Sequence, residues 1–423
     1  MSKYVIVGAC AAGIGAVEAI REIDADGEIT VVSEEQCSHY SRPMISDFVS
    51  GKANLEKMKT RDDQFWQKNN VTLVCKKAVG LNLSEHAVTL EDGTNVSYEK
   101  LLLATGGKPF VPKMEGQEKE GVYTFTNISD AEQLAQKINA GANRAVVIGA
   151  GLIGISVTDA LTKRGVKVTM VELQDKILSL LLDATASEIV EAAVRKAGVN
   201  IITGQSVQKI LGKPDNENQV GSVVLTKGGQ VPCDMVIVAI GVIPRTELVA
   251  GTEVKTNRGI VVDGSMQTSV PNVYASGDVA EAYDFILNQN RQLPLWPLAV
   301  LEGRVAGYNM AGKKADYAGG TNMSSLKYFG IPIVSIGLAN PKPDAALEIL
   351  VNQDAENTVY KKLVLKDNVL VGMTFLGAIE RAGILFYLMK NKINVQAFKD
   401  ALLKDDFGLA ALPESVRTQM NLE

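Results

Sequence analysis

The chain has 423 residues, of which 46% are hydrophobic and 22% are charged, and its formal net charge is −5. A chain of this length is expected to divide into two or three domains and to bury an ample core. The acidic balance offers no basic surface for nucleic acid, and no apolar run reaches the roughly 20 residues that span a bilayer, so neither nucleic acid nor a membrane is expected as a partner.

Residues 3–7 already have the pattern of a strand, which leaves no room for a signal peptide, and we expect a cytoplasmic location. The four cysteines are widely spaced and form no CxxC pair and no zinc or iron–sulfur spacing. The sequence therefore predicts no metal site. Any metal chemistry must come from a partner.

The first strand, helix and strand cover residues 3–32, and the turn between the first two has the spacing of a dinucleotide-binding turn. Gly8 and Gly13 take its first and third glycine positions, and Cys10 takes the second. The helix begins near Ala12. Its free N–H groups and dipole suit a pyrophosphate, so we expect a nucleotide site here.

Cys10 has two interpretations. A thiol at a helix N-terminus has a lowered pKa, which would suit a redox role. No second cysteine lies nearby in the sequence to resolve a disulfide, so the interpretation of Cys10 as a small spacer is favoured. At the end of the second strand, either Glu34 or Glu35 has the spacing of the acid that binds a ribose.

A second strand, helix and strand repeat this pattern over residues 144–171, with a complete GxGxxG turn. An acid follows the turn at the end of the next strand, where it can accept hydrogen bonds from a ribose 2′-hydroxyl. This carboxylate would repel a 2′-phosphate, which favours NADH over NADPH. The residues expected at this site are Gly149, Gly151, Leu152, Ile153, Gly154 and Glu172.

Further strands are predicted over residues 200–204 and 234–240, and loops rich in glycine, proline and asparagine predict linkers at 108–116, 212–218 and 311–322. After residue 321 the pattern changes to antiparallel strands, and helices follow from residue 379. The predicted fold class is α/β, with two Rossmann-like domains and a C-terminal α+β domain. The expected boundaries are 1–112 with 242–320, then 113–241, then 321–423.

The order of five motifs resembles the two-dinucleotide flavoprotein family that includes the pyridine nucleotide–disulfide oxidoreductases. The motifs are the first glycine turn, the ATG of residues 104–106, GxGxxG, VAIGVIP and YASGD. The resemblance covers essentially the whole chain. It implies that the first, discontinuous domain binds FAD and that the domain inserted into it binds NADH.

The HYSRPMISDFVSG segment lacks the redox cysteine of the disulfide reductases, and the C-terminal domain has no histidine, so disulfide reduction is disfavoured. Cys37 lies nearby and is interpreted as an inert structural cysteine, with a stray reactive thiol as the alternative. The segments YSRPMIS and LPLWPLAVLEGRVAGYNMAG instead resemble the NADH:rubredoxin oxidoreductases and the flavoprotein module of assimilatory nitrite reductase.

This resemblance implies the cofactor-binding residues. Arg42 would contact FAD, Asp278 would bond the ribityl–phosphate region, and Gly241 would mark the end of the NAD domain. Taken alone, Arg42 also fits a solvated loop charge, and Trp296 and Pro297 also fit an ordinary helix start. The residues implied for FAD are Gly8, Cys10, Ala12, Gly13, Glu34, Glu35, Arg42, Pro43, Val79, Ala104, Thr105, Gly106, Gly277, Asp278, Trp296, Pro297 and Ala299.

Three residues depart from the pattern of these relatives. Ser156 stands where many have a glutamate beside the nicotinamide, Arg245 replaces an asparagine, and Asp47 replaces a lysine near the flavin. These departures leave the acceptor of the electrons open.

The expected function is an FAD-dependent NADH oxidoreductase that exchanges electrons with a rubredoxin-type or ferredoxin-type carrier, in either direction, without a catalytic side chain. An NADH oxidase that reduces oxygen is the second hypothesis. A flavin-binding redox subunit or interaction protein with little turnover is the third. A homodimer or a larger complex stays open.

Overall fold

The computed structural model describes residues 2–35, 39–354 and 356–420, and its contacts divide the chain into two compact units. Unit 1 consists of residues 1–110, 126–128 and 241–320, and unit 2 of residues 111–125, 129–240 and 321–423. Each unit is therefore built from segments that lie far apart in the sequence. Cys37, singled out above, lies outside the described residues.

Unit 1 is centred on a seven-stranded sheet. In spatial order the strands are β3 (Val71–Val74), β2 (Ile29–Val32), β1 (Ser2–Val7), β6 (Asn95–Leu103), β5 (Ala87–Leu90) and β4 (Ala78–Asn82), and β18 (Val273–Ala275) also pairs with β6. The strands β3, β2, β1, β6 and β18 are parallel, whereas β4 and β5 are antiparallel additions. Every residue of β2 is buried, as expected for a parallel strand covered on both faces.

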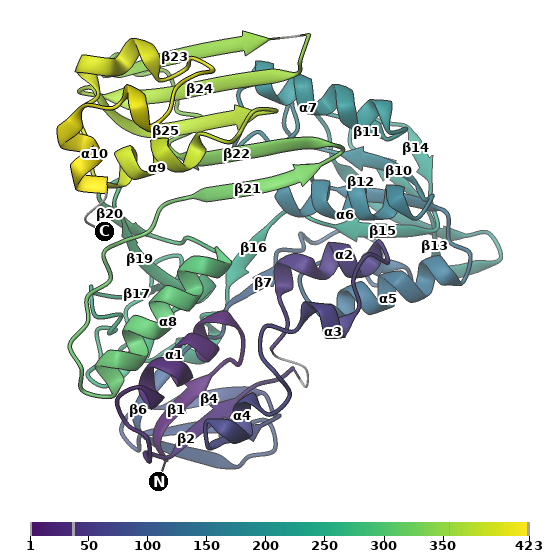
Figure 1. Cartoon of the computed structure of the whole chain (residues 1–423). Helices are drawn as coiled ribbons and strands as arrows, with labels where there is room; N and C mark the ends of the chain where they lie inside the picture. The colour runs from purple at the N-terminus through teal and green to yellow at the C-terminus, as the bar shows by residue number, and fades with distance from the viewer. Residues whose placement is uncertain (1, 36–38, 355, 421–423) are drawn as a thin grey trace. The chain divides into compact units, whose positions relative to one another are not determined.

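Two long helices lie side by side in unit 1, α1 (Ala11–Arg21) and α8 (Trp296–Met310) (Figure 1). They approach so closely that a Cβ at Gly303 would lie 2.0 Å from the carbonyl oxygen of Ala12. Glycines and alanines make this contact possible, and it fixes both helix N-termini within one rigid pair.

The remaining elements of unit 1 are short. They are η1 (Arg42–Met44), α2 (Ile45–Val49), α3 (Leu55–Met58), α4 (Phe65–Lys68), β7 (Gly107–Pro109), β16 (Val242–Pro244), η2 (Glu247–Val249), β17 (Ile260–Val261), η3 (Gly277–Val279), β19 (Ala280–Asp284) and β20 (Gln289–Arg291). The antiparallel pair β7 and β16 joins the residues where the chain leaves unit 1 and where it returns.

Unit 2 contains a five-stranded parallel sheet and a three-stranded antiparallel sheet. The first is ordered β11 (Asn200–Ile202), β10 (Lys167–Val171), β9 (Arg144–Ile148), β15 (Met235–Val238) and β8 (Val122–Tyr123). The second is β12 (Val207–Lys213), β13 (Asn216–Leu225) and β14 (Gln230–Pro232). The helices are α5 (Ile128–Asn139), α6 (Leu152–Lys163) and α7 (Ala184–Lys196).

The C-terminal part of unit 2 is a five-stranded antiparallel sheet with helices at the end of the chain (Figure 1). Its strands in spatial order are β21 (Met323–Tyr328), β22 (Ile331–Gly337), β25 (Val369–Leu376), β24 (Val359–Lys366) and β23 (Leu347–Asp354). After them come α9 (Ala382–Lys390), η4 (Gln396–Ala401), η5 (Leu409–Ala411) and α10 (Glu414–Met420).

One carboxylate attaches the C-terminal sheet to the rest of unit 2. Asp183, the N-cap of α7, accepts hydrogen bonds at 2.7 Å from the hydroxyl of Tyr360 and from Nζ of Lys362. Lys362 is 4% exposed, so its charge depends on this partner. The attachment therefore includes a buried ion pair.

The fold class predicted from the sequence is confirmed, and both strand, helix and strand repeats form over the predicted residues. The prediction of a linker at 212–218 is wrong. These residues form the tight hairpin between β12 and β13, where Pro214 and Asp215 make the turn that joins two paired strands. The predicted linker at 108–116 is wrong at its start, where Lys108 and Pro109 belong to β7. The sequence patterns did not reveal β21 or β23.

Candidate dinucleotide-binding sites

The first glycine turn lies at the carboxyl end of β1 in unit 1. A Cβ at Gly8 would lie 2.1 Å from the carbonyl oxygen of Ala104, and one at Gly13 would lie 2.0 Å from the carbonyl oxygen of Gly8. Both glycines are thus required by packing. Cys10 is the N-cap of α1, and its side chain makes no capping hydrogen bond. The N-cap therefore leaves the first backbone amides of this helix unoccupied.

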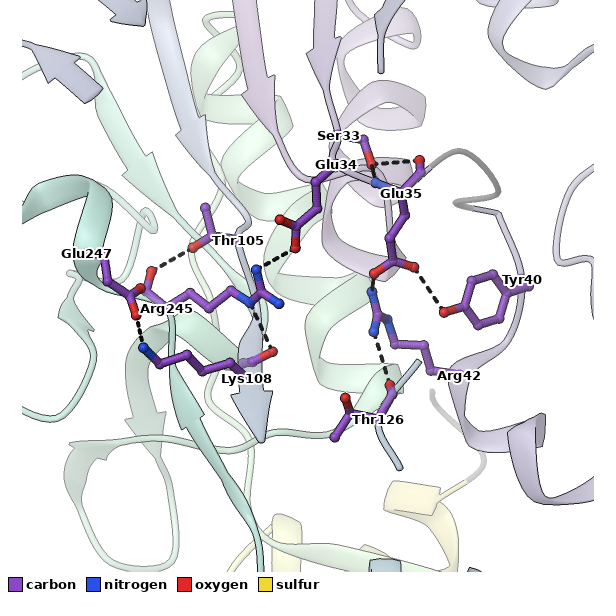
Figure 2. A network of polar contacts seen from close by, with 11 residues as sticks. Ser33, Glu34, Glu35, Tyr40, Arg42, Thr105, Lys108, Thr126, Arg245 and Glu247 are labelled. Atoms are coloured by element: carbon purple, nitrogen blue, oxygen red, sulfur yellow. Dashed lines mark hydrogen bonds and ion pairs between the residues drawn. The ribbon is translucent and has the colours of Figure 1, made fainter. Parts of the chain in front are cut away.

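Arg42 connects this turn to the acid at the end of β2, and Figure 2 shows its contacts with Glu35 and Thr126. Its Nε lies 3.3 Å from Sγ of Cys10, its Nη1 donates to the carbonyl of Thr126 at 3.1 Å, and its Nη2 pairs with the carboxylate of Glu35. The hydroxyl of Tyr40 donates to the same carboxylate at 3.0 Å. Arg42 is therefore a fixed member of the turn, and the alternative of a solvated loop charge does not describe its contacts.

The two acids that the sequence left as alternatives have different partners. Glu35 faces Arg42 and Tyr40, whereas Glu34 forms an ion pair with Arg245, which comes from the segment that returns to unit 1 (Figure 2). Each acid is therefore held by an arginine.

The ATG segment is held by the returning chain in the same region. The hydroxyl of Thr105 donates to the carbonyl of Arg245 at 2.9 Å, and the amide of Arg245 donates to the carbonyl of Gly106 at 3.0 Å. Lys108 and Glu247 form a further ion pair beside them (Figure 2). Arg245, a departure from the family pattern, is thus a structural link between Glu34 and the ATG segment.

The Gly-Asp segment meets both long helices. A Cβ at Gly277 would lie 3.3 Å from Cβ of Ala12 and 3.4 Å from Cβ of Ala299, so α1, α8 and this turn share one contact point. Burial raises the pKa of Asp278, and the nearby charge of Arg42 acts in the opposite direction. An acid in this position resists ionisation unless a partner compensates it.

The other predicted residues of unit 1 make fewer of the contacts that hold the first glycine turn. Trp296 and Pro297 form the first turn of α8, whose N-cap Leu295 has no side-chain capping bond, and Pro43 lies in η1. Val79 is 53% exposed in β4, an antiparallel strand, and the contacts that join the turn, Arg42 and Gly277 do not include it.

The second glycine turn lies at the carboxyl end of β9 in unit 2. A Cβ at Gly149 would lie 2.6 Å from the carbonyl oxygen of Ala239, and one at Gly154 would lie 2.0 Å from that of Gly149. A Cβ at Gly151, the N-cap of α6, would meet no atom beyond its chain neighbours within 4 Å. The turn is thus closed by packing on its inner side and open in front of the helix.

Glu172 lies at this turn, as its spacing predicts. Its carboxylate accepts from the amide of Ala150 at 2.7 Å and from that of Gln174 at 2.8 Å. Leu152 and Ile153 form the first turn of α6, with Ser156 one turn further on. Gly241 begins the returning segment of unit 1, and its carbonyl accepts from the amide of Phe110 at 2.9 Å.

Both turns fit a dinucleotide. Each begins a helix of at least eleven residues whose N-cap makes no side-chain capping hydrogen bond, and each has an acid beside it. In the turn of unit 2 the space in front of Gly151 is open, as a pyrophosphate requires. The residues present thus suit FAD or NADH without rearrangement of the packing glycines.

The cysteines of the described residues differ in their burial. Burial raises the pKa of Cys233 to about 12, which makes this thiol unreactive. Cys10, Cys75 and Cys233 are free, and the described part of the chain contains no cluster of histidine, cysteine and acidic residues that could hold a metal. Within the same residues no helix is both long and apolar enough to cross a bilayer.

Three residues of the site in unit 1 were not identified from the sequence. Tyr40 and Thr126 bind within the network of Figure 2, and Glu302 lies buried in α8 against Gly277. Glu302 is the one of these with a signal in the sequence, since it is the single acid on a mostly apolar helix, WPLAVLEGRVAGYNM.

Two family models match the chain. Residues 2–303 match the family described as pyridine nucleotide-disulphide oxidoreductase, and residues 323–393 match the rubredoxin NAD+ reductase C-terminal domain. The first match spans both glycine turns, and the second spans the antiparallel sheet.

Individual relatives agree with these matches. The chain is 33% identical over 398 residues to subunit epsilon of the NADH-dependent phenylglyoxylate dehydrogenase of Aromatoleum evansii, which covers 93% of each chain. It is 32% identical over 345 residues to an NADH oxidase of Methanocaldococcus jannaschii, which covers 79% of this chain and 76% of the relative. The solved structure of the covalent putidaredoxin reductase–putidaredoxin complex matches with a TM-score of 0.86 at 25% identity over 96% of each chain.

These findings confirm the resemblance inferred from the motifs, and FAD and NADH, the cofactors it implied, are those of the matched family. With most of its length inside one family model, the chain belongs to the pyridine nucleotide-disulphide oxidoreductase family.

Proposed function

We propose that the chain is an FAD-dependent NADH oxidoreductase that passes electrons between NADH and a small electron-carrier protein of the rubredoxin or ferredoxin type. The observation that carries the proposal is the match of residues 323–393 to the rubredoxin NAD+ reductase C-terminal domain, on a chain with two dinucleotide turns. The putidaredoxin complex adds support, since that relative is joined to its carrier.

The proposal assigns a role to each segment. Residues 1–112 and 242–320 bind FAD, residues 113–241 bind NADH, and residues 321–423 form an interface domain. The proposal keeps the cytoplasmic location expected from the sequence.

In the FAD site, the free amides of α1 and α8 supply partial positive charge for anionic groups. Arg42 adds a full positive charge beside the turn, and Asp278 offers a polar group from the Gly-Asp segment. In the NADH site, the free amides of α6 bind the pyrophosphate, and Glu172 selects a ribose without a phosphate.

Bound FAD would supply the redox chemistry, namely the uptake of a hydride from NADH and the release of electrons singly or in pairs. The side chains of this protein bind and orient the two nucleotides. No proton transfer by a side chain is needed for this exchange, and disulfide reduction is not part of the proposal.

Two alternatives have support of their own. The 32% identity to an NADH oxidase favours oxygen as the acceptor, and the 33% identity to a dehydrogenase subunit favours work within a larger complex. The three hypotheses differ in what reoxidises the reduced protein.

An anaerobic stopped-flow experiment tests the proposal. The FAD-loaded protein is first mixed with NADH, and bleaching of the flavin absorbance is followed. The reduced protein is then mixed with oxidised rubredoxin or ferredoxin, and separately with oxygen.

Reoxidation by the iron protein that is faster than by oxygen supports a carrier reductase. Fast reoxidation by oxygen alone contradicts the carrier and supports the oxidase. Slow reaction with both, after fast bleaching, supports a subunit that needs its complex. A flavin that NADH does not bleach contradicts both the reductase and the oxidase, and supports an interaction protein with little turnover.

A further inference from the structure

A buried acid of α8 holds the Gly-Asp turn. Glu302 is 2% exposed, and its Oε2 accepts a hydrogen bond from the amide of Gly277 at 2.8 Å. Gly277 itself has φ +75° and lies between Ala12 and Ala299. The side chain of Glu302 therefore fixes the point where α1, α8 and the Gly-Asp turn meet.

The surroundings of Glu302 contain no compensating cation among the described residues. Asp278, of the same sign, acts on it from η3, and the hydroxyl of Tyr317 lies beside it. That hydroxyl is buried and completes no hydrogen bond in the described structure. Asp284, paired with Arg291 at 3.6 Å, lies beyond Tyr317. From α1, the helix packed on α8, Ala12 contacts this point.

We propose that Glu302 is a positioning residue for FAD, whose buried side chain fixes the Gly277–Asp278 turn and makes FAD affinity depend on pH. The inference rests on the proposed FAD site of unit 1. The inference goes beyond that site, because nothing in the proposed function assigns a role to Glu302.

Burial supplies the reason for the pH dependence. It raises the pKa of Glu302 to about 8, with the hydrogen bond from the Gly277 amide opposing burial and the charge of Asp278 adding to it. Below this pH the side chain is a neutral acid, which can accept from Gly277 with one oxygen and donate from the other toward the unpartnered oxygen of Tyr317.

The direction of the effect follows from the charge of the ligand. The pyrophosphate of FAD adds negative charge to the same region, so binding raises the pKa of Glu302 further. FAD affinity is then highest while Glu302 is protonated in the free protein. It falls as the pH rises above about 8, until the pKa of the complex is passed.

The test is a fluorescence titration of the apoprotein with FAD at pH values from 6.5 to 9.5 and constant ionic strength. For the wild type we expect the Kd at pH 9.5 to exceed that at pH 7 by about tenfold, which corresponds to a pKa one unit higher in the complex. The Glu302→Gln variant keeps an acceptor for Gly277 but has no proton to lose, and its Kd should stay within about twofold.

Glu281→Gln is the matched control. Glu281 is also buried, at 5% exposure, and its carboxylate accepts from the amides of Arg258 and Gly259 at 2.6 and 2.7 Å, away from Gly277. This variant should keep the wild-type pH profile.

A second measurement needs no variant. Calorimetric titration of the wild type with FAD at pH 8.5, in two buffers of different ionisation enthalpy, should show net proton uptake. If the Kd for FAD depends on pH in the same way in the wild type and in Glu302→Gln, or if no proton is taken up, the role of Glu302 is overturned but the proposed function is not. Failure of all three proteins to bind FAD overturns the proposed function as well.

Discussion

Two of the three glycines of the second turn, Gly151 and Gly154, allow the effects of packing and of nucleotide binding to be separated. Gly151 has open space around it and an ordinary φ of −79°, so a valine there should fold without strain. At Gly154 the same substitution places Cβ 2.0 Å from the carbonyl oxygen of Gly149, and the backbone must shift by at least about 1 Å. The two variants therefore test different properties of one turn.

The magnitudes differ accordingly. Gly151→Val should change the free energy of unfolding by no more than about 0.5 kcal/mol. Its side chain covers the amides of α6, and loss of one or two charge-assisted hydrogen bonds removes about 3 kcal/mol of NADH binding, a loss of about 100-fold. Gly154→Val should destabilise the protein by about 1–3 kcal/mol or more.

Two assays measure these effects. Anaerobic titration of the FAD-loaded protein with NADH gives the affinity, and chemical denaturation gives the free energy of unfolding. FAD content should be unchanged in both variants, because the turn lies in unit 2. Wild-type NADH affinity in a folded Gly151→Val variant would refute the assignment of α6 to NADH, and unfolding of that variant would refute the open geometry.

Three further predictions concern single side chains. Glu172→Gln should raise affinity for NADPH relative to NADH by about tenfold, because a repulsive charge is removed, as competition binding would show. Cys10→Ser should leave the FAD Kd within about threefold, whereas Cys10→Leu should raise it by at least about tenfold; equal loss in both would indicate a role for the thiol. Burial acts to raise the pKa of Asp183, but the hydrogen bonds from Lys362 and the other donors lower this pKa overall. The ionised Asp183 therefore stabilises the folded protein above about pH 4, and this stabilisation is lost as the pH falls through the pKa of the folded state. Asp183→Asn should therefore lower the free energy of unfolding by about 3 kcal/mol at pH 7 but by little at acid pH. The control Glu191→Gln, on the same helix, breaks an exposed ion pair and should lower it by about 0.5 kcal/mol or less. Equal losses for the two variants in chemical denaturation at pH 7 would contradict the argument.

The sequence by itself determined the two nucleotide turns and the change to an antiparallel domain. Gly149, Gly151 and Gly154 lie at the turn that their spacing predicts, and Glu172 lies against it. These features depend on short-range rules, namely apolar periodicity, the conformations open to glycine and the spacing of one strand, helix and strand unit. Because these rules act within about thirty residues, the features that they produce can be predicted from one sequence.

Only the tertiary structure decided which partner each charged side chain takes. Glu35 pairs with Arg42 while Glu34 pairs with Arg245, more than two hundred residues away, and Glu302 reaches Gly277 from another helix. The spacing of the sequence contains no information on these pairs. They exist because packing brings distant segments together, and a buried charge or polar group must then find a partner at the point where packing has placed it.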